Sequence, residues 1–367
     1  GAETAQNDAI ADRNEGNPVP NDEKRPQNDV RFPQFDVKIA QERMVGKPYS
    51  LGPKISDWDS KRMVESELSR QDKPQIMLIT GSQPSPCENP AGDNFLLKSM
   101  KNKQDYGRLH GIEIFYNMAN LDDDDQMSGF WAKLPLLRKM MLTHPNVDWF
   151  WWMDSDALFT DMAFEVPMGR YENYNLVLHG WGDMVYKDKN WVGLNTGSFL
   201  LRNCQWSLDL LDAWATLGPE GETRETGGKM LSETLSGRPD NFEADDQSAL
   251  VSLLVTHRET WVEKVFLENS YYLHGYWPTL VHRYEDLMKT SHNGFGDDRW
   301  PFVTHFVGCK PCKNTVADSQ TVCFEQMQRA FNFADNQVLE LYGFRHQSLS
   351  THKVQQIDDG LIASSDI

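Results

Sequence analysis

The sequence predicts an α/β domain in which a mostly parallel central sheet is flanked by helices. From Gln75 onward, short apolar runs typical of buried strands alternate with segments whose apolar residues recur at helical spacing. Such alternation favours a parallel sheet that binds ligands at the carboxyl ends of its strands. The 367 residues are long for one compact domain and short for three. One large domain with an appended segment is therefore expected.

The first predicted strand covers 76–79 and ends at the turn-forming sequence Thr80-Gly81-Ser82. A helix over 94–109 follows, and Gly111 ends it before a strand over 112–116. The apolar residues between Trp131 and Met141 recur at helical spacing, and Pro135 falls in the opening turns, where proline is tolerated. A wholly apolar strand over 149–153 comes next.

Further strands are predicted at 176–180 and 197–201, followed by a helix over 205–217 with an apolar face. The segment 220–239 is polar and rich in glycine, which is typical of a mobile loop or lid. A helix then opens at Asp245 with leucines on one face. A strand over 302–307 and a helix over 325–342 complete the pattern.

The two ends of the chain differ from this domain. Up to Val30 there is almost no large apolar residue, so little surface could be buried to offset the cost of ordering the chain. We expect a flexible stem over 1–47, an arm over 48–74 that packs on the domain, the domain itself over 75–353 and a tail over 354–367. No run of eighteen apolar residues is present, so neither a membrane span nor a secretory leader is expected within these residues, whereas an anchor upstream would be compatible with them.

Composition excludes some partners. The formal net charge of −18 would repel nucleic acid and anionic membrane surfaces. Twelve tryptophans and eleven tyrosines could line a carbohydrate groove by stacking on sugar faces, although any single tryptophan is more often part of the core.

The strongest chemical signal is the pair Asp154 and Asp156 at the end of the strand over 149–153. In an extended chain the two carboxylates would point to the same side, where they repel unless a cation lies between them. Oxygen ligands of this kind suit Mn²⁺ or Mg²⁺, which commonly also bind substrate phosphates. The alternative is a solvated turn, because Asp and Ser are frequent turn formers.

Two later segments add candidate ligands. His305 lies in the strand before Gly308 and could be a third metal ligand or a core histidine, while Lys310 could neutralise a diphosphate or simply be a surface lysine. Asp245 and Asp246 stand where a helix N-cap is expected, which accounts for one of them, and with Gln247 they could also contact sugar hydroxyls. In the segment from Asn195 to Ser198, Gly197 would let a ligand approach the backbone, unless this is an ordinary turn.

Five cysteines are too few for a disulfide scaffold. Cys309 and Cys312 have no partner pair in zinc-finger spacing, so a zinc site is not expected. A local disulfide among Cys309, Cys312 and Cys323 could form in an oxidising compartment.

Several motifs together resemble glycosyltransferase family 34, in particular its plant xyloglucan xylosyltransferases. They are Trp151-Trp-Met-Asp-Ser-Asp-Ala157, His179-Gly-Trp181, Leu194-Asn-Thr-Gly-Ser-Phe199, Phe242-Glu-Ala-Asp-Asp-Gln247 and His305-Phe-Val-Gly-Cys-Lys310. The resemblance covers roughly residues 48 to 353, in order and without large gaps.

This resemblance implies a GT-A (Rossmann-like) fold and a set of site residues. The metal, expected to be Mn²⁺, would be bound by Asp154, Asp156 and His305. Asp245, Asp246, Gln247 and Lys310 would line the reacting face. The donor would be bound by a larger set: Thr80, Gly81, Ser82, Lys133, Ser155, Gly180, Asn195, Gly197, Gly308 and Lys310.

The resemblance also implies an activity. Family enzymes are retaining transferases and type II membrane proteins of the Golgi lumen, which fits the polar stem. UDP-xylose is the expected donor and a β-1,4-glucan chain the expected acceptor, with α-1,6 transfer and assembly into homo- or hetero-oligomers with related transferases. The alternatives are a galactomannan galactosyltransferase that uses UDP-galactose, a weakly active scaffold subunit, and, less well supported, a metal-dependent glycoside hydrolase.

Overall fold

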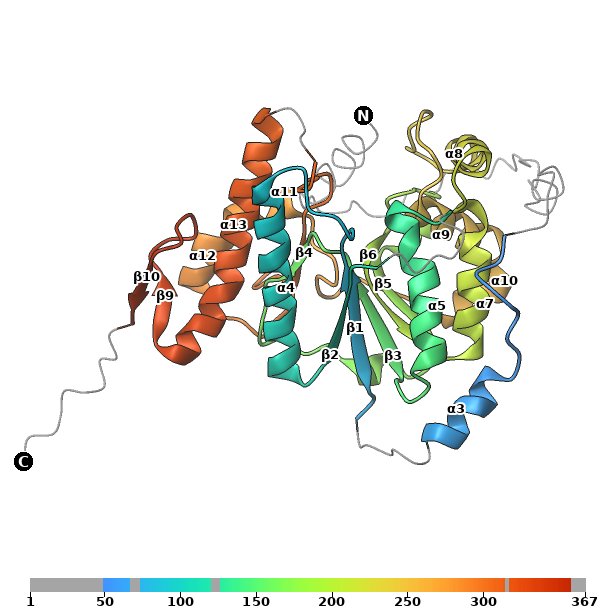
Figure 1. Ribbon diagram of the computed structural model, residues 1–367, viewed down its shortest axis with the longest axis horizontal. Helices are drawn as coiled ribbons and strands as arrows, with labels where there is room; N and C mark the ends of the chain where they lie inside the picture. The colour runs from blue at the N-terminus through green and yellow to red at the C-terminus, as the bar shows by residue number, and fades with distance from the viewer. Residues whose placement is uncertain (1–48, 67–72, 120–125, 314–316, 358–367) are drawn as a thin grey trace, which may run out of the picture.

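The computed structural model describes residues 49–66, 73–119, 126–313 and 317–357, so the predicted stem over 1–47 lies outside the described residues. At its centre is a six-stranded sheet in the order β2-β1-β3-β6-β5-β7 (Figure 1). The strands are β1 Ile76–Gly81, β2 Glu113–Asn117, β3 Trp149–Met153, β5 Leu176–Gly180, β6 Leu194–Arg202 and β7 Val265–Glu268. Only β6 runs against its neighbours, because it pairs antiparallel with both β3 and β5 while the other pairings are parallel. The predicted fold class is confirmed.

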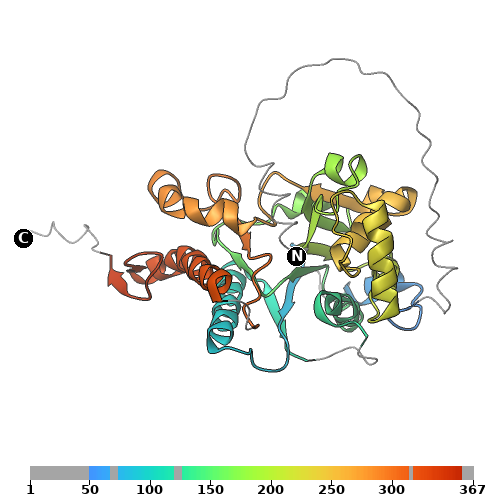
Figure 2. The same ribbon diagram turned by 90° about the horizontal axis from the view of Figure 1, so that it is seen from above.

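Helices cover both faces of this sheet (Figures 1 and 2). On one face lie α4 Pro90–His110 and α13 Ala317–Leu339, with α11 Trp277–Leu280 and α12 Tyr284–Thr290 beyond them. On the other face lie α5 Lys133–Thr143, α7 Gln205–Trp214, α9 Asp246–Thr256 and α10 Arg258–Trp261. The short α6 covers Gly182–Tyr186, and 3₁₀ turns occupy Gly129–Ala132, Met168–Tyr171, Ala215–Leu217, Val262–Lys264, Val281–Arg283 and Glu340–Tyr342.

Helix α4 begins four residues before the predicted start. Asn89 is its N-cap and accepts a hydrogen bond from the Gly92 amide, and Pro90 occupies the first helical position, where its missing N–H costs nothing. Gly111 ends the helix in the left-handed conformation, as predicted.

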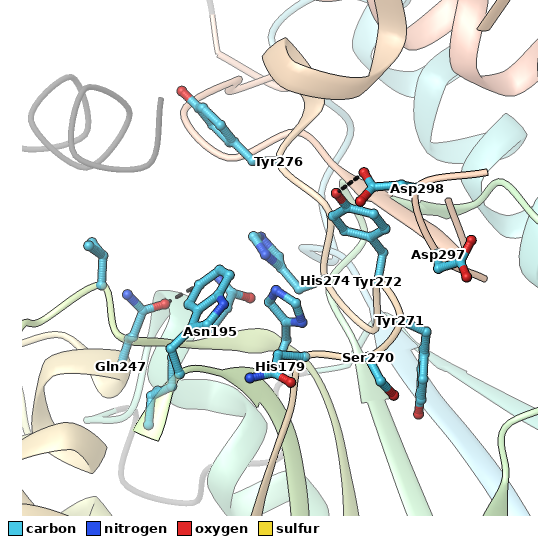
Figure 3. Close-up of a pocket in the computed structure, with 14 residues that line it drawn as sticks. His179, Asn195, Gln247, Ser270, Tyr271, Tyr272, His274, Tyr276, Asp297 and Asp298 are labelled. Carbon is cyan, nitrogen blue, oxygen red and sulfur yellow. Dashed lines mark hydrogen bonds between the residues drawn. The ribbon is translucent and has the colours of Figure 1, made fainter. Parts of the chain in front are cut away.

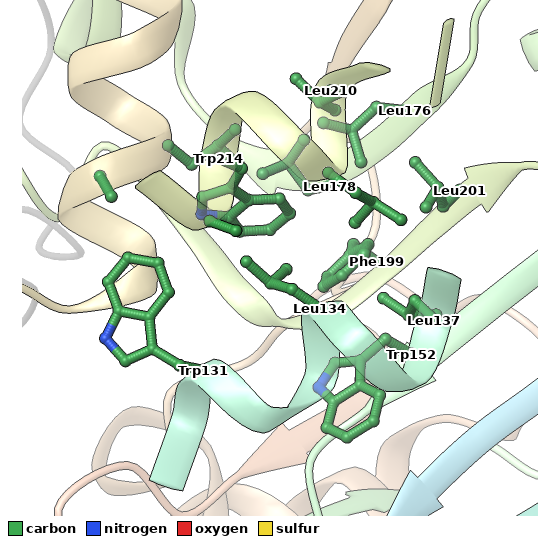
Figure 4. Close-up of a cluster of buried hydrophobic side chains, with 14 of the residues drawn as sticks. Trp131, Leu134, Leu137, Trp152, Leu176, Leu178, Phe199, Leu201, Leu210 and Trp214 are labelled. Carbon is green, nitrogen blue, oxygen red and sulfur yellow. The ribbon is translucent and has the colours of Figure 1, made fainter. Parts of the chain in front are cut away.

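The alternation of side chains along β3 divides the core in two. Phe150 and Trp152 face the α5 and α7 side, where they join the cluster drawn in Figure 4. Trp149, Trp151 and Met153 face the α4 and α13 side. Every residue of β3 is buried. A strand buried on both faces reads as a continuous apolar run, as this sequence does.

Two smaller sheets complete the structure. Strand β4 Ala157–Phe159 pairs antiparallel with β8 Val303–His305, and β9 Phe344–His346 pairs with β10 Val354–Gln356. The predicted tail therefore starts with a strand, and residues 358–367 lie outside the described part of the chain. Within the described residues, no helix is both long and apolar enough to cross a bilayer.

The predicted mobile loop over 220–239 is wrong, because Glu222–Thr234 forms helix α8. The glycines that suggested flexibility serve close packing instead. A Cβ on Gly228 would lie 2.3 Å from the Phe242 carbonyl oxygen, and one on Gly227 would touch Leu217. Glycine is needed here because the helix lies directly against a neighbouring segment.

The described part of the arm contacts the domain. Helix α3, Trp58–Ser66, buries Trp58, whose indole N–H donates to the Asn203 side chain at 2.8 Å. Leu51 donates its amide to Asp212, and Arg138 donates to the Pro53 carbonyl.

Candidate active site

The two aspartates of the Asp-Ser-Asp motif follow β3 at the carboxyl edge of the sheet. They do not lie in one extended strand as predicted. Residues 154–156 form a turn closed by the Ala157 amide, which donates to the Asp154 carbonyl at 3.2 Å. The turn leaves one oxygen of each carboxylate within 4.8 Å of the other, and Ala157 then starts β4.

His305 reaches the same place from a distant part of the chain. Strand β8 pairs with β4 so that His305 lies opposite Ala157, and the Phe306 amide donates to the Asp156 carbonyl at 3.0 Å. The His305 Nε2 atom is 3.1 Å from a carboxylate oxygen of Asp156 and 3.8 Å from one of Asp154.

These three side chains fit a divalent cation. One ligand atom from each lies within 4.8 Å of the others, and two carboxylates with one imidazole are a donor set that suits Mn²⁺. Burial lowers the pKa of His305, but the nearby carboxylates of Asp156 and Asp154 outweigh it and the net direction is upward. The site attracts positive charge, which a cation would supply.

Gly197 on β6 makes room for this cluster. A Cβ at this position would lie 2.2 Å from His305 Cε1 and 2.9 Å from an Asp154 oxygen. The sequence suggested that a ligand approaches the backbone here, but the groups that approach it are the side chains of the candidate metal ligands.

Gly197→Ala is therefore expected to displace the His305 ring or the β6 backbone by about 1 Å and to reduce catalytic activity about a hundredfold, with Mn²⁺ bound more weakly. Steady-state kinetics and Mn²⁺ titration would measure both effects. Gly169→Ala is the matched control, since no atom lies within 4 Å of the added methyl. If both variants keep wild-type affinity for Mn²⁺, the steric argument fails.

Lys133 is buried between the Asp154 side chain and the Asp246 side chain at the start of α9. Its side chain is 2% exposed, and its ammonium is 2.9 Å from Asp246 and 3.5 Å from Asp154. It also donates to the Thr196 carbonyl at 3.1 Å. Burial lowers the pKa of Lys133, but the two carboxylates outweigh it and raise the pKa overall, so the ammonium stays charged.

The three polar residues that open α9 have different surroundings. Asp245 caps the helix by accepting from the Ser248 amide at 2.7 Å, and its other oxygen is 3.1 Å from the Arg238 guanidinium. Asp246 turns toward Lys133. The Gln247 side chain accepts a hydrogen bond from Asn195 on β6 at 3.1 Å.

A cavity of about 590 Å³ opens on one side of the cluster, and we call it the Lys310 cavity. Its lining includes Gly81, Ser82, Asn117, Lys133, Asp154, Ser155, Asp156 and Lys310. Lys310 is exposed on a loop that two disulfides hold: Cys87–Cys312 joins it to the segment before α4, and Cys309–Cys323 joins it to α13. Of the predicted local disulfides, Cys309–Cys323 is confirmed, whereas Cys312 pairs with Cys87, which the prediction did not include.

A second cavity, of about 180 Å³, is lined in part by His274, and we call it the His179 cavity (Figure 3). It is lined by imidazoles, aromatic rings, amides and carboxylates: His179, His274, Trp181, Tyr272, Tyr276, Asn195, Gln247, Asp297 and Asp298 among others. The His274 ring contacts the His305 ring edge to face, with centroids 4.9 Å apart. The Lys310 cavity thus borders the Asp154 and Asp156 side chains, while the His179 cavity reaches His305 through the His274 ring.

Both imidazoles in this cavity are buried and neutral near pH 7. Burial lowers the pKa of His179 to about 4, and burial with His305 and His179 nearby holds the pKa of His274 well below its usual value. Within the described residues, His179 Nδ1 and His274 Nε2 have no hydrogen-bond partner. Such nitrogens beside aromatic rings are suited to sugar hydroxyls.

His179 is expected to make the protein acid-labile. Unfolded, it takes up a proton as pH falls through 6.5, whereas in the fold it does so only near pH 4. Stability is therefore lost between these values, by roughly 3 kcal/mol. Urea denaturation from pH 6.5 to 4 should show a smaller loss for His179→Gln, while His282→Gln, at an exposed site, should match the wild type. Equal pH dependence in all three proteins would contradict this.

Some of the predicted site residues line the two cavities, and others do not. Those around the Lys310 cavity converge, as do Asn195 and Gln247 at the His179 cavity. Thr80 is fully buried, Gly180 packs against the Gly193 carbonyl, and Gly308 forms a turn with φ +87°. His274 and Tyr272 were missed, and the run of aromatic and histidine residues over 271–277 was the only signal for them.

An acid–acid–imidazole cluster at the carboxyl edge of such a sheet is the arrangement expected of a GT-A glycosyltransferase. Residues 72–316 match the family described as the galactosyl transferase GMA12/MNN10 family, glycosyltransferase family 34. The chain belongs to this family and is a glycosyltransferase.

Named relatives show the same affiliation. The chain is 60% identical over 320 residues to xyloglucan 6-xylosyltransferase 2 of Arabidopsis thaliana, a match that covers 85% of this chain and 68% of that protein. It is 61% identical over 317 residues to probable xyloglucan 6-xylosyltransferase 1 of Oryza sativa subsp. indica, covering 84% and 70%. A solved glycosyltransferase involved in glycosylation of the PBCV-1 major capsid aligns over 69% of this chain and 98% of its own, with 14% identity and a TM-score of 0.39, too low to support a conclusion.

Proposed function

We propose that this chain transfers xylose from UDP-xylose to the 6-hydroxyl of glucose in a β-1,4-glucan, in α linkage and with a divalent metal. The observation that carries the proposal is the position of Asp154, Asp156 and His305 next to a cavity with lysines and a cavity lined by aromatic rings and imidazoles. The names of the relatives support xylose and xyloglucan.

The donor would occupy the Lys310 cavity. Asp154, Asp156 and His305 would hold Mn²⁺, which would supply Lewis-acid stabilisation to a departing diphosphate. Lys310, exposed on a loop that two disulfides fix, would neutralise further charge on the phosphates. Ser82 and Ser155 line the same space and would contact the nucleotide.

The acceptor would lie in the His179 cavity. Flat aromatic rings stack on the faces of glucose units, and the neutral imidazoles offer both a donor and an acceptor to hydroxyl groups. Asn195 and Gln247 lie where this cavity meets the Lys133–Asp246 pair. A hydroxyl placed here would approach the donor sugar next to Asp246.

The stereochemical course is retention, and the surroundings of α9 favour attack from the same face as the leaving group. Both carboxylate oxygens of Asp245 have partners, in Ser248 and Arg238. Asp246 is paired with Lys133. A covalent route would need Asp246 to leave that ion pair, which makes it the less favoured alternative.

The deciding experiment measures UDP release from UDP-xylose and from UDP-galactose, each with and without a cello-oligosaccharide and with EDTA as control. Mn²⁺-dependent turnover of UDP-xylose that the acceptor stimulates is expected. Preference for UDP-galactose would assign the chain to galactosyl transfer. If neither donor turns over in protein that binds UDP and Mn²⁺, the scaffold role is favoured.

A further inference from the structure

Among the described residues, the segment that carries Asp154 and Asp156 and continues into β4 has a strand partner on one side only, namely β8. The backbone groups of Asp156 and Leu158 face β8, while those of residues 155, 157 and 159 face α4, which lies beside β4 (Figure 1). The backbone N–H and C=O groups of a helix bond to one another within the helix, so they cannot pair with an adjacent strand. The backbone N–H and C=O groups on the α4 side of this segment must therefore form hydrogen bonds with side chains of α4.

Three side chains on one face of α4 perform this task. Ser99 donates to the Ser155 carbonyl at 2.5 Å, and Lys103 donates to the Ala157 carbonyl at 2.7 Å. Asn102 donates to the Phe159 carbonyl and accepts from the Phe159 amide, both at 2.8 Å. The Lys103 ammonium also donates to Ser99 Oγ at 2.7 Å, which links the first two.

A lysine at position 103 is expected to lower the stability of the fold. Lys103 is fully buried, and its hydrogen-bond partners, Ser99 and the Ala157 carbonyl, are neutral oxygens. Burial lowers the pKa of Lys103 to about 7, even though the charges of Asp156 and Asp154 act in the opposite direction. A buried ammonium without a carboxylate partner costs stability that an apolar residue of similar length would not. Its ammonium donates to the carbonyl of Ala157, the first residue of β4 and the one that follows Asp156, so the compensating benefit should be found there.

We propose that Lys103, together with Ser99, is a positioning residue pair that holds the turn over 154–156 in the shape that binds the divalent cation. Lys103 donates a hydrogen bond to Ala157, which follows Asp156 in the chain and lies opposite His305 in the β4–β8 pairing. Anchoring its carbonyl therefore sets the spacing of Asp156 from His305. The inference rests on the metal site of the proposed function.

The test is Mn²⁺ affinity, measured by electron paramagnetic resonance of the free ion. Lys103→Met keeps the length of the side chain and removes its donors, and Ser99→Ala removes one donor with little change in volume. The dissociation constant is expected to rise about tenfold or more for Lys103→Met, within the range typical of residues that support metal ligands. A smaller rise, about threefold, is expected for Ser99→Ala, because one neutral hydrogen bond to the turn is lost. In turnover assays the Mn²⁺ concentration for half-maximal rate should rise in the same ratio, with most of the rate recovered at saturating Mn²⁺.

Asn203→Ala is the matched control for loss of stability. Asn203 is fully buried and donates to the carbonyls of His144 and Val147, but it lies beside the amino end of β3, whereas Asp154 follows the carboxyl end of that strand. It should lower the melting temperature and leave Mn²⁺ affinity within about twofold of the wild type.

Unchanged affinity in Lys103→Met and Ser99→Ala would overturn the proposal. Tighter binding in Lys103→Met would also overturn it, because repulsion between the ammonium and the cation would then outweigh positioning. If Lys103→Met does not fold, Ser99→Ala decides alone. A wild-type protein that binds no Mn²⁺ would instead reject the metal site, and with it the proposed function.

Discussion

Asp156→Asn is expected to reduce metal-dependent transfer by at least a factor of about a hundred while leaving the protein folded. The substitution replaces one of three candidate ligands by a neutral amide, 3.1 Å from His305 Nε2 in the native arrangement. The fold should survive, because backbone hydrogen bonds make the β4–β8 pairing, including the one from the Phe306 amide to the Asp156 carbonyl, and an asparagine side chain can still hydrogen-bond the His305 ring.

UDP release from UDP-xylose, Mn²⁺ titration and circular dichroism together measure these effects. Asp183→Asn is the control, because it makes the same chemical change at a carboxylate whose side chain is 78% exposed. Near-normal turnover by Asp156→Asn would remove this residue from the proposed metal site.

Lys133→Met is expected to abolish activity and also to destabilise the fold, by about 3–5 kcal/mol near neutral pH. Its ammonium is the cationic partner of the buried Asp246 and a neighbour of Asp154. Without it, Asp246 is a buried carboxylate whose pKa burial already raises. That carboxylate can take up a proton, so the destabilisation should shrink as pH falls.

The double variant Lys133→Met/Asp246→Leu separates the two effects, since replacing a buried ion pair with apolar residues is often neutral for stability. Chemical denaturation should show recovery of most of the lost stability, while activity stays absent. Lys187→Met, in an exposed pair with Asp183, should change stability by less than about 1 kcal/mol. A single variant Lys133→Met as stable as the wild type would show that the buried pair contributes little.

The sequence supports prediction best where a feature is local. The wholly apolar strand over 149–153 and the acids that follow it were visible because burial on both faces leaves a continuous apolar run. The cap at Asp245 was visible because capping depends on a few adjacent residues.

Features that depend on distant packing were not visible. Gly227 and Gly228 suggested a loop because nothing in sequence reveals the segment that α8 packs against. The grouping of His305 with Asp156 was implied by the family resemblance alone, because their contact depends on a pairing between β4 and β8 that no local pattern reveals. Lys103 lies within the predicted helix over 94–109, yet a lysine in a helix normally suggests a solvent-exposed face, and only the position of β4 explains its burial.

The disulfide between Cys87 and Cys312 has a practical consequence for anyone who handles this protein. Its two cysteines are separated by 225 residues, so during synthesis the bond can form only after nearly the whole domain has been made. It closes in surroundings that oxidise thiols and is vulnerable where they are kept reduced. Protein produced in a reducing cytosol, or assayed with dithiothreitol, would have an untethered Lys310 loop. Weak turnover in such a preparation would reflect the redox history of the sample as much as the chemistry of the site.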